Sequence, residues 1–313
     1  MRSPIRRLHE LLVFFSACLG LACHRRDVPL PSLAASAVGD TTGLVARGEY
    51  VVRNAAACGG CHADVAVHDN DGALSGGREF RDWRLGTVRA SNLTPDSATG
   101  LGTWSDAEIV RALRNGEAKD GRLLAPVMPY GWLHDMSDRD ALAVARYLRT
   151  LPPIRNDVVQ RPSIWFKLAK LLFLGPSAGG SAAAPPPGPT AIYGEYLAQH
   201  AALCADCHTP RTGLQSKPDR RRLFAGDAHP SKEFPANPSN LTPDNATGIG
   251  RWSEPDFVRT IRTGVNLNGD SLHPFMPWRA NRRMTNDDLR AIYRYLRTLP
   301  PIENLVPRRT AAP

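Results

Sequence analysis

One short motif with the residues needed for cofactor chemistry occurs twice in this chain. The motif is Cys-x-x-Cys-His, formed by Cys58, Cys61 and His62 in the first copy and by Cys204, Cys207 and His208 in the second. Two thiols three positions apart on a helical turn can each form a thioether with a haem vinyl group, while the following histidine lies under the iron. The motif therefore predicts two covalently bound haem c groups.

Two other chemistries of paired cysteines fit the sequence less well. A zinc site would need both cysteine pairs in one place, but the pairs occupy equivalent positions of two separate units. A thioredoxin-like dithiol would follow a strand in a βαβ setting, and the sequence has no such setting. Two motifs in matching contexts favour haem over both.

The sequence around the motifs is duplicated. Residues 48–50, Gly-Glu-Tyr, recur at 194–196, an offset of 146 that the haem motifs keep. Further along the offset is 148, because Asn-Leu-Thr-Pro-Asp at 92–96 recurs at 240–244. In both copies this segment is followed by Ala-Thr-Gly and then by Trp-Ser. A tandem repeat of this length indicates two copies of one fold, each large enough to enclose one haem.

Each unit is expected to be all-α. The first helix is expected from about Gly48 to Cys58, where apolar residues follow helical spacing. A long segment rich in Gly, Asn and Pro follows, without strand alternation, and a haem would supply its core. Capping residues with an acidic residue three positions later predict the starts of the second and third helices, at Ser105, Ser137, Ser253 and Thr285.

The repeated methionines suggest the second axial ligand of each iron. Met136 and Met284 directly precede helix caps, where an apolar residue packs on the first helical turn. Met128 and Met276 lie instead in Pro-x-Met-Pro loops, whose rigidity suits a thioether held at a metal. No spare histidine recurs in both units. The expected axial pairs are therefore His62 with Met128 and His208 with Met276.

Trp104 and Trp252 recur at the starts of the second helices. A buried tryptophan usually finds an acceptor for its indole N–H. Each is expected to be either a core aromatic alone or, in addition, a hydrogen-bond donor to a haem propionate.

The N-terminal residues predict export. Residues 1–22 combine a basic start with a short apolar run, which is typical of a signal peptide and too short to span a bilayer. Cys23 is the expected first mature residue and lipid-attachment site of a lipoprotein, with simple cleavage or an uncleaved anchor as alternatives. Residues 23–47 are rich in small residues and proline and read as a tether. The expected location is periplasmic and membrane-tethered.

The remaining boundaries follow from the repeat. The two domains are expected at 48–153 and 191–303, separated by a linker at 154–190 and followed by a tail at 304–313. The linker holds a short apolar segment, expected to pack on a haem domain rather than lie in a membrane interface, and then a Pro-rich spacer. The formal charge of +9 does not imply nucleic-acid binding, and it is compatible with an acidic docking partner or an anionic lipid surface.

These features resemble tandem class I c-type cytochromes, in particular the cytochrome c subunits of bacterial membrane-bound alcohol and gluconate dehydrogenases. The resemblance covers about residues 48–303 and rests on the haem motifs, the Asn-Leu-Thr-Pro-Asp segments, the Met-Pro loops and the Tyr-Leu-Arg-Thr-Leu-Pro-Pro endings. It implies two class I cytochrome c domains, each wrapped around one haem, with the histidine and loop methionine as axial ligands. Those subunits commonly carry three haems, whereas this chain has two motifs.

The expected function is single-electron transfer in the cell envelope, between a dehydrogenase or quinol donor and an oxidase or soluble cytochrome. Six-coordinate irons would leave no position open for substrate, so an electron carrier is favoured over an enzyme. The alternative is a dihaem redox enzyme, such as a peroxidase or a thiosulfate-oxidising cytochrome, with one haem open to substrate.

Overall fold

The computed structural model describes most of the chain from Thr41 onward. The chain divides into two compact units, Met1–Leu30 and Pro31–Pro313, and every described residue belongs to the second. The expected signal peptide, Cys23 and most of the expected tether lie outside the described residues. The structure describes residues 41–63, 71–172, 183–212, 217–228 and 236–307.

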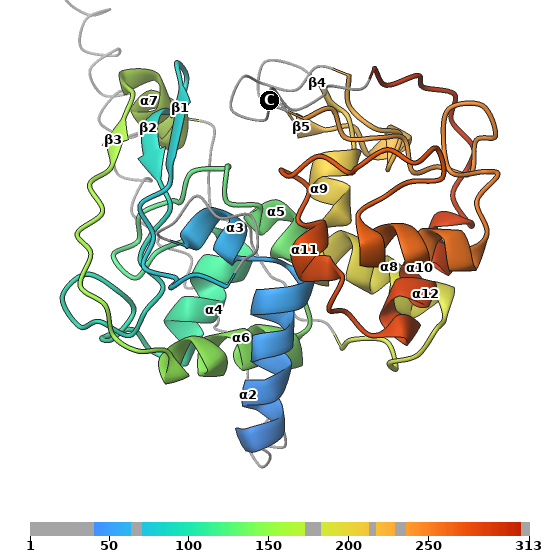
Figure 1. Cartoon of the computed structure of the whole chain (residues 1–313). Coiled ribbons are helices and arrows are strands. Elements are labelled where there is room, and N and C mark those ends of the chain that lie inside the picture. Colours follow the sequence, from blue (N-terminus) through green and yellow to red (C-terminus); the bar gives the residue numbers. More distant parts are fainter. Residues whose placement is uncertain (1–40, 64–70, 173–182, 213–216, 229–235, 308–313) are drawn as a thin grey trace, which may run out of the picture. The chain divides into compact units, whose positions relative to one another are not determined.

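The same series of helices occurs twice along the described residues (Figure 1). In the first half it is α2 (Thr41–Glu49), the π-helix η2 (Tyr50–Ala55), α3 (Gly59–His62), α4 (Asp106–Asn115), α5 (Tyr130–Leu133) and α6 (Asp138–Thr150). In the second half it is α8 (Ala191–Tyr196), the π-helix η3 (Leu197–Ala201), α9 (Cys204–His208), α10 (Glu254–Thr263), α11 (Trp278–Asn281) and α12 (Asn286–Leu296). The expected helical character is confirmed, and α5 and α11 are additional short helices.

The first helix begins earlier than expected, at Thr41 instead of about Gly48. Its extra turns are held by contacts with α6, because Leu44 is buried there and the Arg47 guanidinium binds both carboxylate oxygens of Asp140, at 2.8 and 2.7 Å. These contacts are distant in sequence, so the local pattern of residues 41–47 does not reveal them. Tertiary packing extends the helix beyond what periodicity predicts.

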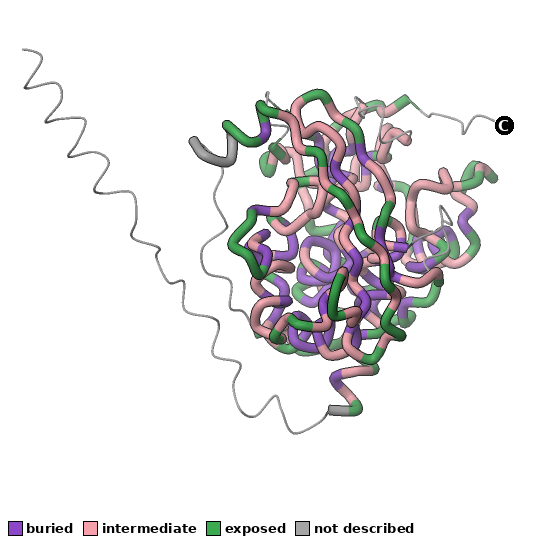
Figure 2. Tube along the Cα trace, turned by 90° about the vertical axis from the view of Figure 1, so that its left-hand side faces the viewer, coloured by how far each residue is buried: buried purple, intermediate pink, exposed green. Residues whose placement is uncertain are grey.

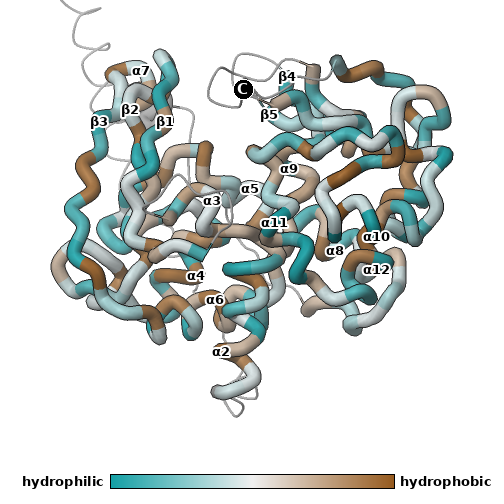
Figure 3. The backbone as a smooth tube through the Cα atoms, viewed as in Figure 1, coloured by the Kyte–Doolittle hydropathy of each residue, from teal (hydrophilic) through white to brown (hydrophobic). Residues whose placement is uncertain are grey.

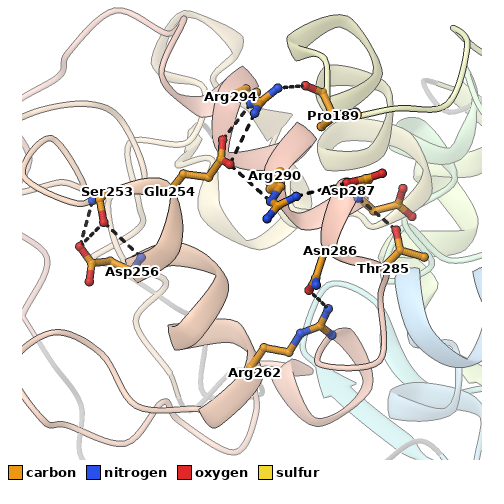
Figure 4. Close-up of polar contacts among 11 residues, drawn as sticks. Pro189, Ser253, Glu254, Asp256, Arg262, Thr285, Asn286, Asp287, Arg290 and Arg294 are labelled. Carbon is orange, nitrogen blue, oxygen red and sulfur yellow. Dashed lines mark hydrogen bonds and ion pairs between the residues drawn. The ribbon is translucent and has the colours of Figure 1, made fainter.

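The predicted helix starts are confirmed, with one difference between the helices. Ser105 and Ser253 form complete capping boxes with Glu108 and Asp256, and Figure 4 shows the second of these. In α6 the Ser137 hydroxyl caps the N–H of Asp140, but the Asp140 carboxylate binds Arg47 instead of reaching back to Ser137. The Asp140 carboxylate, which was predicted to complete a capping box, therefore makes a tertiary contact instead.

The first and last helices of each half cross closely at a glycine. α2 packs on α6, and α8 packs on α12. A Cβ atom at Gly48 would lie 1.9 Å from the carbonyl oxygen of Ala143, and one at Gly194 would lie 1.8 Å from that of Ala291. Only glycine permits this backbone approach.

Short strands correct the all-α expectation. β1 (Glu79–Asp82), β2 (Gly86–Arg89) and β3 (Arg161–Pro162) form an antiparallel sheet in that order, with Phe80 opposite Val88 and Thr87 opposite Arg161. β4 (Arg211–Thr212) and β5 (Lys217–Pro218) form a second antiparallel pair. Strands of two to four residues are too short to produce a recognisable alternation, which is why the sequence did not predict them.

Acidic residues at the start of α10 tie it to α12. The Glu254 carboxylate lies 2.8 Å from Nε of Arg294 and 3.4 Å from Nε of Arg290, as Figure 4 shows. In the first half Asp106 at the start of α4 binds Arg146 of α6 in the same way, at 2.8 Å. An acidic residue at a helix N-terminus also complements the helix dipole, so each contact stabilises the helix start as well as the pairing.

The buried side chains form one main cluster in each half, and the two clusters meet. Buried residues concentrate where the helices pack, as Figure 2 shows. The cluster of the second half includes Ala55 and Trp132 from the first half, and Leu203 contacts both clusters. The two repeats therefore share a continuous apolar contact.

The first part of the expected linker packs on the first half. β3 pairs with β2, and α7 (Ile164–Leu172) follows at once, with Phe166 buried. Among the described residues, no helix has the length and apolar character needed to span a membrane. Of the predicted Pro-rich spacer at 175–189, the part from residue 183 onward is described, as irregular chain leading into α8.

Candidate haem sites

Both cysteine motifs lie on short helices reached through a strained residue. Cys58 is the residue before α3 and Cys204 is the first residue of α9, and all four motif cysteines are free thiols. The residue before each motif, Ala57 or Leu203, has a left-handed backbone with φ of 52° or 56°. This conformation is uncommon for residues other than glycine, and its repetition at the same place points to a functional constraint.

The motif cysteines are held as neutral thiols. Burial raises the pKa of Cys58 to about 12 and that of Cys204 to about 12. Burial also raises the pKa of Cys207, with the neighbouring Asp206 carboxylate adding to the effect. A pKa above the usual value for a thiol means that these groups stay protonated at neutral pH.

Each motif histidine is oriented by a backbone carbonyl. Nδ1 of His62 lies 2.8 Å from the carbonyl oxygen of Ser91, and Nδ1 of His208 lies 2.7 Å from that of Ser239. Since a carbonyl can only accept, Nδ1 carries the proton and Nε2 is the nitrogen with a free lone pair. Burial lowers the pKa of both imidazoles, so they are neutral at pH 7, which is the form that binds a metal.

The Asn-Leu-Thr-Pro-Asp segments hold these carbonyls in place. The Asn92 amide donates to the carbonyl of Ile154 at 2.8 Å, and the Thr94 hydroxyl bonds to the Asn92 side chain at 2.8 Å. Asn240 makes the same contact with Ile302 at 2.7 Å. The segment is thus anchored to the chain that follows the last helix. Ser91 and Ser239 were not among the predicted site residues, although each directly precedes its Asn-Leu-Thr-Pro-Asp segment.

The two pairs of methionines differ in the way that the sequence predicts. Met136 and Met284 are almost fully buried, with 1% and 2% of their surface exposed, and each packs in the core of its half. Met128 and Met276 are half-buried in loops just before α5 and α11, at the edge of the same cores. Among the described methionines, Met128 and Met276 are therefore the two that are not fully enclosed in the packed interior.

The repeated tryptophans Trp104 and Trp252 make polar contacts through their backbone carbonyls. The backbone carbonyls of Trp104 and Trp252 accept from Arg149 and Tyr293, and both rings pack half-buried against their cores. Within the described residues, no acceptor is recorded for either indole N–H. The indole nitrogen of Trp278, two residues after Met276, is buried without a partner in the described part of the chain. Trp278 was not among the predicted site residues, and its unpaired N–H is the signal that identifies it.

The two haem motifs lie near each other. Asp206, between the cysteines of the second motif, accepts a hydrogen bond from the Trp132 side chain of the first half and binds Arg211 at 2.5 Å. Its carboxylate also helps to raise the pKa of Cys61 in the first motif, beside the larger effect of burial. The sequence predicted both motifs but contained no signal that they approach each other.

A reciprocal pair of tyrosines joins the two halves. The Tyr50 hydroxyl donates to Asp288 at 2.5 Å and accepts from the N–H of Thr285 at 3.0 Å. Its counterpart Tyr196 donates to Asp140 at 2.6 Å and accepts from the N–H of Ser137. Each tyrosine thus completes the N-terminal cap of the last helix in the other half, an arrangement with approximate two-fold symmetry.

Removing one of these hydroxyls should weaken the pairing of the halves. In Tyr196→Phe the buried Asp140 and Ser137 groups lose a partner, and we expect the free energy of unfolding to fall by about 1–3 kcal/mol. Tyr130→Phe is the matched control, because no partner is recorded for the Tyr130 hydroxyl within the described residues. Denaturant unfolding of the haem-loaded protein measures both. Equal stability of the two variants would contradict this role.

The spare histidines and basic residues have structural partners. His200 bonds to the carbonyl of Trp132 at 2.8 Å, and His134 to that of Arg114. Arg283 pairs with Asp71 of the first half at 2.8 Å. His68 and His229 lie outside the described residues. Within the described residues, no group of three or more His, Cys, Asp or Glu side chains is arranged to hold a metal ion.

Comparisons with known proteins find similarity to cytochrome c proteins. No protein-family model matches the chain. The chain is 33% identical over 293 residues to the cytochrome c subunit of the alcohol dehydrogenase (quinone) of Komagataeibacter europaeus, covering 86% of this chain and 60% of that protein. It is 31% identical to the gluconate 2-dehydrogenase cytochrome c subunit of Pantoea cypripedii, covering 82% of this chain and 59% of that protein.

A third relative is matched along nearly its whole length. A protein of Cereibacter sphaeroides named diheme cytochrome c-type is 29% identical over 300 residues, which cover 93% of this chain and 97% of that protein. By contrast, the chain spans about three fifths of the length of the dehydrogenase subunits that it matches.

Proposed function

We propose that this chain, a homologue of cytochrome c subunits of dehydrogenases and of a dihaem c-type cytochrome, is itself a dihaem electron carrier. It would pass single electrons in the cell envelope from a dehydrogenase or quinol to an oxidase or soluble cytochrome. The observation that carries the proposal is the repeated site: in each half the motif histidine is held by a backbone carbonyl, and a loop methionine packs at the edge of the core.

The fold proposed for this function is a pair of class I cytochrome c domains, at 48–153 and 191–303. The repeated series of helices, with a glycine at each crossing of first and last helix, supports it. Each domain would enclose one covalent haem. The groups half-buried beside each motif, including Trp104 and Trp252, would then form the walls of the haem cavity.

The residues present fit two haem c groups. Cys58 and Cys61, or Cys204 and Cys207, would hold each group covalently, and bound haem would supply a one-electron iron couple. His62 with Met128 and His208 with Met276 are the proposed axial ligands, a set associated with comparatively high reduction potentials. The unpaired indole N–H of Trp278 could donate a hydrogen bond to a haem propionate. The indole N–H groups of Trp104 and Trp252 are proposed to do the same.

The proposed location and partners follow from the relatives and the N-terminus. The relatives named as dehydrogenase subunits favour a dehydrogenase as the electron donor. Residues 1–22 are proposed as a signal peptide and Cys23 as a lipid-attachment site, which would place the protein in the periplasm with a membrane tether.

Carbon monoxide binding to the reduced, haem-loaded protein tests the proposed ligands and the function together. We expect wild type to resist the ligand, because a methionine occupies the sixth position of each iron. Met128→Ala should bind carbon monoxide at half of the haem and lose half of the thioether-to-iron charge-transfer band in the oxidised spectrum. Met136→Ala, which changes a core methionine next to the same site, should keep the band.

Two outcomes would contradict the proposal in different ways. If Met128→Ala keeps the full charge-transfer band, Met128 is not the ligand. If wild type itself binds carbon monoxide rapidly at one haem, that haem is open, and a dihaem redox enzyme such as a peroxidase replaces the electron carrier as the proposed function.

A further inference from the structure

The exposed apolar residues of the molecule are concentrated in one small module of the first half. The module consists of β1, β2, the turn between them, β3 and the start of α7, which lie together in Figure 1. Most of the large apolar side chains exposed in the described part of the chain belong to it or border it: Trp83, Val159, Ile164, Trp165 and Leu168. The others, Ile192, Leu267 and Leu305, are scattered.

The module is a fixed part of the fold. The N–H of Ser163, directly before α7, donates to the carbonyl of Leu85 in the β1–β2 turn at 3.0 Å, and the Ser163 hydroxyl caps the N–H of Phe166 at 3.0 Å. A Cβ atom at Gly86 would lie 2.4 Å from the Ser163 nitrogen, so the turn and the helix start are in direct backbone contact. Backbone contacts therefore join the β1–β2 turn to the first turn of α7.

We define the Trp83–Trp165 surface as the exposed apolar side chains of the β1–β2 turn and of the adjoining start of α7: Trp83, Ile164, Trp165 and Leu168. Trp83 is 71% exposed, Ile164 and Trp165 are each 62% exposed, and Leu168 is 42% exposed. Leu168 lies on the same helix face as Ile164 and Trp165, because it is four positions from the first and three from the second. Figure 3 shows hydrophobic residues in α7 although it lies at the surface beside the sheet. An exposed apolar face of this kind indicates a binding surface.

The charges around this surface are basic. Arg161 and Lys167 are exposed and have no carboxylate partner within the described residues, and 78% of the Arg81 side chain is exposed. The module's own carboxylates are already paired, Glu79 with Arg81 and Arg89 and Asp82 with Arg84. The surface thus complements an anionic partner.

We propose that the Trp83–Trp165 surface binds an anionic lipid bilayer, lying in the headgroup region with α7 parallel to it. Indole rings prefer the interface between lipid and water, where the apolar ring is buried and the N–H stays hydrated. A lysine can extend from a helix toward anionic headgroups while its stem covers apolar surface. α7 has nine residues, too few to cross the roughly 30 Å apolar core, so it lies on the bilayer.

Vesicle sedimentation with the haem-loaded full chain tests this proposal independently of electron transfer. Every sample carries Cys23→Ser, so that no lipid attached at that position contributes. We expect wild type to bind phosphatidylglycerol vesicles more tightly than phosphatidylcholine vesicles, with weaker binding at high salt. Trp83→Ala/Trp165→Ala should weaken binding more than about tenfold, and Lys167→Gln about fivefold.

The matched control removes exposed apolar side chains elsewhere. Ile192→Ala/Leu305→Ala changes residues that are 70% and 79% exposed outside the surface, and it should bind vesicles as wild type does. All these side chains are exposed, so unchanged haem absorbance and unfolding temperature are expected for each variant. The proposal is overturned if wild type fails to bind anionic vesicles or if both double variants bind equally. Retention of a dehydrogenase subunit by wild type but not by Trp83→Ala/Trp165→Ala, without vesicle binding, would assign the surface to a protein instead.

Discussion

Gly194→Ala is expected to destabilise the second half by about 3 kcal/mol or more, although it adds only one methyl group. The new Cβ would lie 1.8 Å from the carbonyl oxygen and 2.3 Å from the carbonyl carbon of Ala291 in α12. Both atoms belong to the backbone of α12, so no side chain can rotate away to make room. α8 and α12 would have to separate, and Tyr193, Leu197 and Ile292 beside the crossing would lose packing.

The control for this prediction is a glycine in a helix with open space around it. Gly131 lies in α5, and a Cβ atom there would meet no other atom within 4 Å. Gly131→Ala should be neutral or slightly stabilising, since alanine favours a helix by up to about 1 kcal/mol over glycine. Thermal unfolding of the haem-loaded variants measures the difference. If Gly194→Ala unfolds at the wild-type temperature, the crossing is not as close as described.

The sequence predicted the haem motifs and the methionine loops because both are local and repeated. Met128 and Met136 are the same residue type in the same unit, yet neighbouring prolines and helix caps distinguish them, and their burial differs as this distinction requires. Trp278 could not be found in the same way. Its counterpart in the first unit is Tyr130, so Trp278 is not among the residues that are identical in both units.

The contacts between the halves could not be predicted from the sequence, because the residues that make them are already explained by a local role in helix capping. Asp140 and Asp288 each stand three positions after a capping residue, which predicts a capping box. In the structure their carboxylates bind Tyr196 and Tyr50 of the other half. A local pattern cannot show whether a carboxylate binds its own helix cap or a residue of the other half. The symmetric pair of tyrosine–aspartate hydrogen bonds can be seen only in the folded structure of both halves.

Cys204→Ser/Cys207→Ser is expected to have the largest effect, because it should remove one of the two proposed haems and with it the packing that this haem would supply to the second half. Cys204, Trp252 and Met276 lie half-buried at the edge of the apolar core of the second half, where a haem attached at the motif would contact them. The haem content, measured as the pyridine haemochrome, should fall from two groups to one per chain. We expect the second half to lose its cooperative unfolding transition.

The loss should extend to the first half through the tyrosine pair. If α12 and α8 are no longer ordered, Tyr50 loses Asp288 and Asp140 loses Tyr196, two hydrogen bonds to carboxylates that together contribute on the order of 2–5 kcal/mol. The remaining haem domain should therefore unfold at a lower temperature than in wild type. Cys58→Ser/Cys61→Ser is the matched variant. Because the tyrosine contacts are symmetric, loss of the first haem should destabilise the second half to a similar extent. A remaining domain of unchanged stability in both variants would mean that the halves fold independently and that the tyrosine contacts only orient them.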